Sequence, residues 1–349
     1  MKSQISIVVL FFVVSFGVYG CDTPVQSTSY QDVGEFRWQA DGSAIFGFYQ
    51  SFTVSQNAIS LPSIAYDIAR FNPDGSLNHL YKNDAKSRPI DPASGDIESY
   101  APAIYVSGDG STIVAQLEND LYRYSTQTNI LVKVETGFHL IAVSPDLKYA
   151  LGCTSPGNRP HKTIKVLDIT GAASRTVTNF DVDELVLEPG LWLSGGTFAF
   201  SCRDSAGAHI NIYDTTGTLS SVVGAANLPF HNCQYNSGTG NLFVTNWSGG
   251  ASNHFIEKIN LATKSRSVIF AQKAANFVVT NDEQTIVYTM YDSTSTLHFR
   301  SRNLSTLAER ELPSDVFRIA SLSPAEDKLA YVSGNETVNQ IRVIPFVRP

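Results

Sequence analysis

Charged residues are scarce in this chain of 349 residues, and cysteine is scarcer still. Asp, Glu, Lys and Arg make up 16% of the sequence, against roughly 25% in an average soluble protein. The formal net charge is −7 and no run of basic residues occurs, so we expect no nucleic-acid partner. Only 4 residues are cysteine, too few for a disulfide-bonded scaffold.

The chain also lacks the short motifs that mark common catalytic and cofactor sites. It has no nucleophile elbow, phosphate-binding loop, His-Glu-x-x-His zinc motif, dinucleotide fingerprint or Cys-x-x-Cys pair. An active site, if there is one, must therefore be assembled from residues that are distant in the sequence.

A long apolar run occurs at the start of the chain, over residues 5–18. One lysine before it and small residues after it are typical of a secretory signal peptide, which predicts removal of residues 1–20. The sequence Val18-Tyr19-Gly20-Cys21 resembles a bacterial lipobox. We therefore expect lipidation of Cys21 and an exported lipoprotein that faces the periplasm or the cell exterior. The alternative is ordinary cleavage after Gly20 and simple secretion.

The remainder of the chain predicts an all-β fold. No long segment carries apolar residues at helical spacing. Instead, apolar or alternating runs of about five to eight residues are separated by clusters of Gly, Asp, Asn, Ser and Pro.

Two landmarks recur seven times along these runs. The first is a turn followed by a hydrophobic strand, and we take Ile45, Ile113, Tyr149, Phe198, Leu242, Ile286 and Leu329 as the first residues of these strands. The second is a strand that ends on a turn residue, at Asn72, Ser125, Asp168, Asp214, Asn260, Asn303 and Pro345. Both landmarks repeat at about 45 residues, the length of a four-stranded propeller blade. The sequence therefore predicts a seven-bladed β-propeller over residues 33–349.

Closure of this ring needs one more strand. Residue 349 falls where the seventh blade would begin its fourth strand, and an open edge is a liability. Residues 21–32 would form the anchor and linker, and we expect residues 24–31 to supply the missing strand, so that an N-terminal strand closes the ring.

Two repeats carry a family resemblance. Residues 143–151 (VSPDLKYAL) and 322–331 (LSPAEDKLAY) resemble the Ser-Pro-Asp-Gly-Lys repeats of TolB-like propellers, which are relatives of the WD-repeat proteins. The resemblance implies blades and their turns and assigns no catalytic residue. The family includes periplasmic scaffolds, peptidase-associated propellers and some polysaccharide lyases, so it implies a fold more than a function.

The repeat register indicates which distant residues would meet near the axis. Counting back from the strand starts, with allowance for longer turns, places six polar residues at one end of the innermost strands: Glu35, His139, Glu188, His231, Asn276 and Arg318. We call these six residues the inner ring. They could bind an anionic ligand or transfer protons, and His139 and His231 could hold a divalent metal as cofactor. The alternative is a water-filled channel mouth with no function.

Cysteine spacing yields one further hypothesis. Cys233 lies on the predicted inner strand of the fifth blade, next to the blade that holds Cys202, so we expect a Cys202–Cys233 disulfide. The alternative is that the thiols pack as small apolar groups.

These observations favour a binding scaffold at the cell envelope as the function. We expect a monomer, anchored to the membrane by its lipid, whose partner is an envelope protein or a carbohydrate ligand. The second hypothesis is a metal-assisted lyase or hydrolase that acts on an acidic glycan at the channel mouth. The long polar segment 81–100 is either a binding loop or an inert surface loop.

Overall fold

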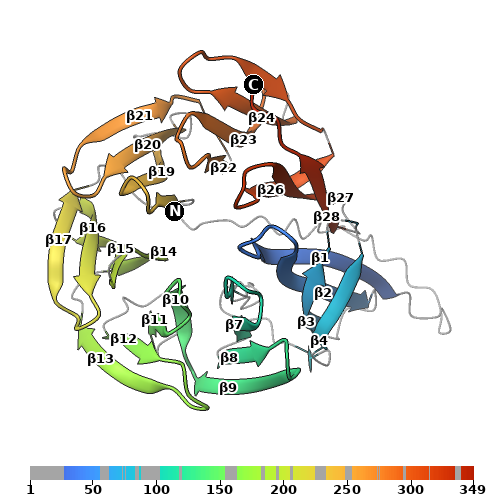
Figure 1. The fold of residues 1–349 in the computed structure, drawn as a ribbon, viewed down its shortest axis with the longest axis vertical. Coiled ribbons are helices and arrows are strands. Elements are labelled where there is room, and N and C mark those ends of the chain that lie inside the picture. Colours follow the sequence, from blue (N-terminus) through green and yellow to red (C-terminus); the bar gives the residue numbers. More distant parts are fainter. Residues whose placement is uncertain are drawn as a thin grey trace, which may run out of the picture.

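The protein is a seven-bladed β-propeller, as predicted (Figure 1). The computed structural model describes residues 27–55, 63–72, 74, 76–82, 86–87, 103–117, 120–153, 163–181, 185–193, 196–204, 207–224, 233–247, 254–272, 274, 276–293, 296–313, 315–334 and 339–349. These residues form antiparallel sheets around one axis and contain no helix. Accordingly, the described part of the chain offers no apolar helix of membrane-spanning length.

Each blade runs outward from the axis in chain order. Blade one comprises β1 (Ser27–Trp38), β2 (Ile45–Ser55), β3 (Ser63–Phe71), β4 (Leu77–Lys82) and the short β5 (Lys86–Ser87), which also pairs with β3. Blade two comprises β6 (Ile104–Val106), β7 (Thr112–Leu117), β8 (Asp120–Ser125) and β9 (Ile130–Thr136). Blade three comprises β10 (His139–Val143), β11 (Tyr149–Cys153), β12 (Thr163–Asp168) and β13 (Arg175–Asp181).

The second half of the ring follows the same order. Blade four comprises β14 (Leu185–Trp192), β15 (Thr197–Asp204), β16 (Gly207–Asp214) and β17 (Leu219–Gly224). Blade five comprises β18 (Cys233–Asn236), β19 (Asn241–Trp247), β20 (His254–Asn260) and β21 (Arg266–Phe270). Blade six comprises β22 (Asn276–Val279), β23 (Thr285–Tyr291), β24 (Leu297–Asn303) and β25 (Glu309–Glu311). Blade seven has three described strands, β26 (Val316–Leu322), β27 (Lys328–Gly334) and β28 (Asn339–Pro345).

Aspartates build several of the turns between the first two strands of a blade. The carboxylates of Asp109, Asp146 and Asp282 each accept a hydrogen bond from the backbone N–H two residues further on, at 3.0 to 3.1 Å. The residue that directly follows each of these aspartates has a positive φ. Gly110 (φ 71°) adopts this conformation freely, whereas it strains a residue with a side chain, such as Glu283 (φ 60°). We call the end of the propeller that carries these turns the turn face.

The second landmark also folds as predicted. In blades two to seven the landmark residue is the last residue of the third strand, and Asn72 directly follows β3. The side chains of Asp214 and Asn260 accept hydrogen bonds from backbone N–H groups in the turns that follow, at 2.8 and 2.9 Å. These side chains therefore direct the chain into the fourth strand.

Neighbouring blades pack face to face through apolar clusters. Each of the seven clusters joins two consecutive blades. The joint between blades one and two, for example, packs Phe46 and Phe48 against Ile104 and Ile113, all of them buried. Since each blade buries its faces only against its neighbours, the sheets are stable as a closed ring.

The ring closes differently from the sequence prediction. Residues 27–31 belong to β1 and pair with residues 51–55 of β2, so the prediction that they form the fourth strand of blade seven is wrong, and residues 24–26 lie outside the described part. The reason is that β1 and β2 are joined by a short turn, so their pairing continues locally and closes no long loop.

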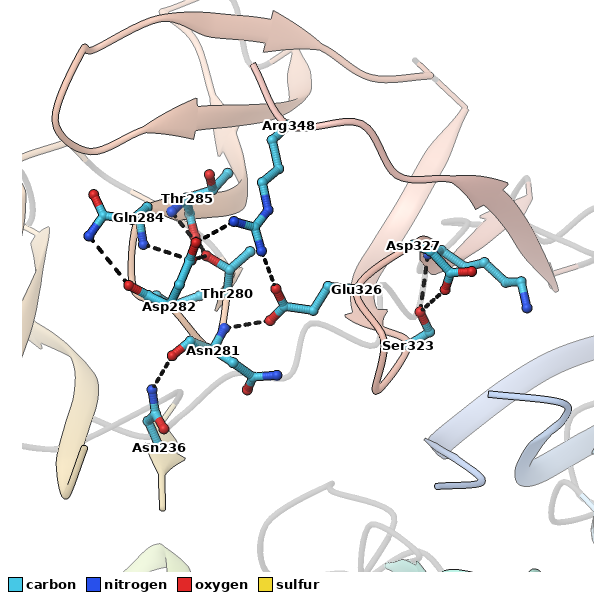
Figure 2. A network of polar contacts seen from close by, with 12 residues as sticks. Asn236, Thr280, Asn281, Asp282, Gln284, Thr285, Ser323, Glu326, Asp327 and Arg348 are labelled. Carbon is cyan, nitrogen blue, oxygen red and sulfur yellow. Dashed lines mark hydrogen bonds and ion pairs between the residues drawn. The ribbon is translucent and has the colours of Figure 1, made fainter. Parts of the chain in front are cut away.

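Side-chain contacts fasten the last blade on both sides. On one side, Trp38 in β1, the innermost strand of blade one, donates a hydrogen bond from Nε1 to the Ser321 carbonyl of blade seven at 3.0 Å. Blades seven and one also share an apolar cluster. On the other side, Arg348 lies between Asp282 of blade six and Glu326 of blade seven (Figure 2). The N–H of Asn281 also donates to Glu326, so the turns of blades six and seven are linked directly.

Candidate binding site at the inner ring

The structure places five of the six predicted inner-ring residues on innermost strands. Glu35 lies in β1, His139 begins β10, Glu188 lies in β14, Asn276 begins β22 and Arg318 lies in β26. His231 lies outside the described residues. Side chains are described at His139 and Asn276, both of them partly buried, and the backbone alone is described at the other three.

Strand pairing shows which of these residues share one level. Asn276 pairs with Thr289, His139 with Cys153 and Arg318 with Val332. In the second strands of these blades, the first residue that pairs with the innermost strand is Ile286, Ala150 or Leu329. Each of the three partners lies three residues after that first paired residue. These three inner-ring positions are therefore equivalent in the ring.

This equivalence depends on irregular pairing in the innermost strands. In blade three the second strand begins at Tyr149, as predicted, but its pairing with β10 begins one residue later, where Ala150 pairs with Val143. An extra residue in β10 compensates for this offset and places His139 at the predicted level. Register breaks lie between residues 33 and 36 in β1, 140 and 142 in β10, 187 and 191 in β14, and 316 and 321 in β26.

The breaks in β1 and β14 contain the two inner-ring glutamates. Glu35 and Glu188 fall inside the irregular segments and have no directly paired residue on the second strand. Bulges re-aim side chains and are enriched beside active and binding sites. Four of the innermost strands thus depart from regular pairing at the level of the inner ring.

Two glycines permit this irregular backbone. A Cβ on Gly152 would lie 2.2 Å from the His139 carbonyl oxygen, and a Cβ on Gly190 would lie 2.1 Å from Ile141 Cγ2. Ile141 is the extra residue of β10 and Gly190 lies in the break of β14. The irregular segments of blades three and four therefore interlock at Gly190, and a side chain there would force the two blades apart, whereas a side chain at Gly152 would force β11 away from β10 within blade three.

Gln116 of β7 orients the His139 imidazole. Its Oε1 accepts a hydrogen bond from the Leu140 N–H at 2.8 Å, and its Nε2 lies 3.4 Å from His139 Nδ1. Because a backbone N–H can only donate, the amide must turn Oε1 toward Leu140 and Nε2 toward the imidazole. His139 Nδ1 is then the acceptor, and the neutral ring carries its proton on Nε2.

That arrangement does not suit His139 as a metal ligand. Nδ1 is occupied by the amide, and Nε2 would have to lose its proton before it could coordinate a metal. No group of three His, Cys, Asp or Glu side chains suited to a metal occurs among the described residues. The predicted partner ligand, His231, lies outside them, as does the predicted lipidation site, Cys21.

Cys233 is a free thiol, so the predicted Cys202–Cys233 disulfide is wrong. Cys233 begins the innermost strand of blade five, whereas Cys202 lies in the second strand of blade four. Sheets packed face to face stand about 10 Å apart, beyond the roughly 7 Å between Cα atoms that a disulfide spans. Burial raises the pKa of the Cys233 thiol to about 12, so the thiol is un-ionised at neutral pH.

Gln116 is the residue of this site that the sequence analysis missed. It is 1% exposed and lies in an otherwise apolar strand, TIVAQL. A buried amide in such a strand signals a specific hydrogen-bond partner. Its partner could not be recognised from the sequence, because the contact joins two different blades.

Comparisons with known proteins support the fold. No family model and no curated protein matches the chain. Among solved structures, an oligogalacturonate lyase in complex with manganese is 11% identical, with 93% of this chain and 92% of that chain covered and a TM-score of 0.62. The oligogalacturonate lyase of Vibrio parahaemolyticus is 12% identical, with the same coverage and a TM-score of 0.59.

Propellers of unrelated roles match equally well. A chain of the mitotic checkpoint complex is 15% identical, with 96% of this chain and 99% of that chain covered and a TM-score of 0.60. A WD40 domain matches less well, with a TM-score of 0.53, and TolB has a TM-score of 0.46. At such low identities the likeness shows the propeller fold alone.

Proposed function

We propose that the protein is an exported, lipid-anchored propeller that binds a partner at the cell envelope through its inner ring. The observation that carries this proposal is the set of register breaks in β1, β10, β14 and β26, which coincide with inner-ring residues. Regular pairing would serve a purely structural ring better, since each break gives up ladder hydrogen bonds.

The residue types of the inner ring indicate the chemistry of the partner. Two carboxylates, two imidazoles, an amide and a guanidinium provide acceptors and donors of both charges. Such a set complements a ligand that also carries both charges, for example a peptide segment of an envelope protein or a peptidoglycan fragment with its carboxylates and amine. The lipid on Cys21 would hold the propeller near such partners.

The test is a titration of the purified protein with a soluble muropeptide, followed by calorimetry. We expect saturable binding that His139→Ala weakens by about tenfold, the effect of one lost hydrogen bond to a charged group. His209→Ala, in β16 of blade four, is the matched control and should bind like the wild type. Absence of binding, or equal binding by the His139→Ala variant, would contradict the proposal.

A second candidate function is cleavage of an acidic glycan. It is favoured by the similarity to two oligogalacturonate lyases, which spans more than nine-tenths of this chain and of theirs. The Nε2–H group of His139, which Gln116 orients, could donate a hydrogen bond to the departing glycosidic oxygen and stabilise the negative charge that develops on it.

An oligogalacturonate assay separates the two functions. In β-elimination a base removes the proton next to the carboxylate, the bond to the glycosidic oxygen breaks, and that oxygen takes up a proton. The new double bond is conjugated with the carboxylate and absorbs in the ultraviolet, whereas hydrolysis yields reducing ends alone. Turnover that is lost in His139→Ala, measured with and without added MnCl2, would favour the enzyme. Binding of muropeptide with no turnover would favour the scaffold.

A further inference from the structure

A second site lies on the turn face, between blades one and two. A cavity of about 240 Å³ opens there. Its lining includes Phe46, Arg70 and Asn78 from blade one and Asp109 and Thr126 from the turns of blade two, with Gln39 from the first turn of blade one. This cavity is at the opposite end of the innermost strands from the inner ring, so the inference does not depend on the proposed function.

Arg70 occupies a position of the repeat at which blades two and five carry a basic residue that contacts the following blade. It lies two residues before Asn72, as Arg123 lies two before Ser125 and Lys258 two before Asn260. Arg123 donates to the carbonyls of Ile169, at 3.3 Å, and of Thr170, both in blade three. Lys258 Nζ donates to Glu283 of blade six at 2.6 Å. In these two blades the cation is therefore a structural link.

Arg70 makes no such link. Its Nε is buried and has no hydrogen-bond partner within the described residues, and no ion pair of Arg70 is found among them either. The guanidinium carbon lies 5.9 Å from the centre of the Phe46 ring, a contact of modest strength. Thr126, in the turn of blade two that faces it, donates its hydroxyl to the Gly110 carbonyl at 2.9 Å.

The nearby carboxylates are already engaged in their own turns. Asp109 Oδ1 accepts hydrogen bonds from Ser107 Oγ (2.7 Å), the Ser111 N–H (3.0 Å) and Ser111 Oγ (2.8 Å). Asp41 Oδ1 likewise accepts from the Ser43 N–H at 2.8 Å, and Arg70 acts on Asp41 only through space. A part-buried guanidinium that finds no acceptor within the described part of the chain is costly, and it is the natural partner of a planar anion.

We propose that this cavity binds a small hydroxy acid, with Arg70 pairing with its carboxylate and Gln39, Asn78 and Thr126 contacting its hydroxyl groups. The cavity is smaller than the roughly 300–1,000 Å³ of sites for drug-sized ligands, so it suits a single sugar acid. Ser107 and Ser111 hold the pKa of Asp109 at about 2, so this carboxylate is negatively charged at neutral pH. That charge favours a monoanion with neutral hydroxyl groups over a doubly charged phosphate.

Calorimetry with D-glucuronate tests the proposal, and D-glucose is the neutral counterpart of the same shape. The wild-type protein should bind glucuronate and not glucose, with an affinity that falls as salt rises. Arg70→Gln should weaken binding about tenfold or more, the effect of losing a charge-assisted hydrogen bond. Arg123→Gln, the equivalent position in the next blade, should bind like the wild type.

Melting temperatures provide a readout that needs no ligand. Arg123→Gln should lower the melting temperature, because Arg123 donates to two carbonyls of blade three. Arg70→Gln should leave it unchanged or raise it, because the buried Nε of Arg70 has no hydrogen-bond partner among the described residues. The proposal is overturned if the wild-type protein does not bind glucuronate, or if it binds glucose or inorganic phosphate as tightly as glucuronate. It is also overturned if Arg70→Gln binds glucuronate as tightly as the wild type, or if Arg70→Gln and Arg123→Gln lower the melting temperature by the same amount.

Discussion

Glu283 offers the sharpest test of how the blades are held together. Its carboxylate is 9% exposed and accepts a hydrogen bond from Lys258 Nζ at 2.6 Å. It also accepts from Asn241 Nδ2 at 2.9 and 3.0 Å, from Asn236 Nδ2 at 3.1 Å and from the Thr239 hydroxyl. All four donors belong to blade five, so one side chain of blade six fastens the joint between the two blades.

The expected loss for Glu283→Ala follows from these contacts. Removing one partner of a buried ion pair costs about 3–5 kcal/mol. Lys258 is 34% exposed and can regain water, and Asn236 keeps its hydrogen bond to the Asn281 carbonyl at 2.8 Å. We therefore expect a loss of about 2–4 kcal/mol, or a fall in melting temperature of roughly 3–6 °C for a chain of this length. Glu283→Gly should lose about 1 kcal/mol less, because glycine relieves the positive φ.

The pH dependence separates the charge from mere packing. Burial opposes ionisation of Glu283, but the Lys258 ammonium and the donors of Thr239 and Asn241 outweigh it and lower the pKa. A carboxyl with a lowered folded pKa stabilises above its unfolded pKa of about 4.3, and that stability is lost as pH falls through the folded pKa. The advantage of the wild type over Glu283→Ala should therefore shrink in acid.

Differential scanning fluorimetry from pH 7 to pH 3 measures these quantities. Glu311→Ala is the control, because that carboxylate is 53% exposed in its ion pairs and should contribute at most about 1 kcal/mol. The reasoning would be refuted if Glu283→Ala melted like Glu311→Ala at pH 7, or if its deficit were unchanged at pH 3.

Three further predictions concern the irregular strands, the turns and export. Gly190→Ala should lower stability by about 1–3 kcal/mol in thermal melts, because the added Cβ would lie 2.1 Å from Ile141 Cγ2. Gly224→Ala is the control and should leave stability unchanged, because its Cβ would meet no atom within 4 Å. Asp109→Asn keeps a hydrogen-bond acceptor but removes the charge of a carboxylate whose folded pKa is about 2. The wild type should therefore melt at a higher temperature than this variant above about pH 4, and the difference should vanish toward pH 2. Labelled palmitate should be incorporated by the wild type and not by Cys21→Ser; an unlabelled wild type would favour simple secretion.

Much of the fold follows from the sequence because its signals are local. Turn residues and alternating strands repeat in every blade, and each signal acts within about ten residues. Asp214 and Asn260 direct their turns as predicted, since a side chain that accepts from the next backbone amides needs no distant partner. The same local pairing explains the error at the N-terminus, where residues 27–31 extend the β1–β2 hairpin instead of crossing to blade seven.

What the sequence by itself determined is therefore the number of blades and the level at which His139, Asn276 and Arg318 lie. Only the tertiary structure decided how those residues are held: Gln116 reaches His139 from another blade, and Gly190 makes room for Ile141. It also decided that Arg123 is satisfied while Arg70, at the equivalent position, is left beside a cavity. The physical reason is that the repeat dictates each strand locally, whereas partners across a joint depend on the shape of the neighbouring blade.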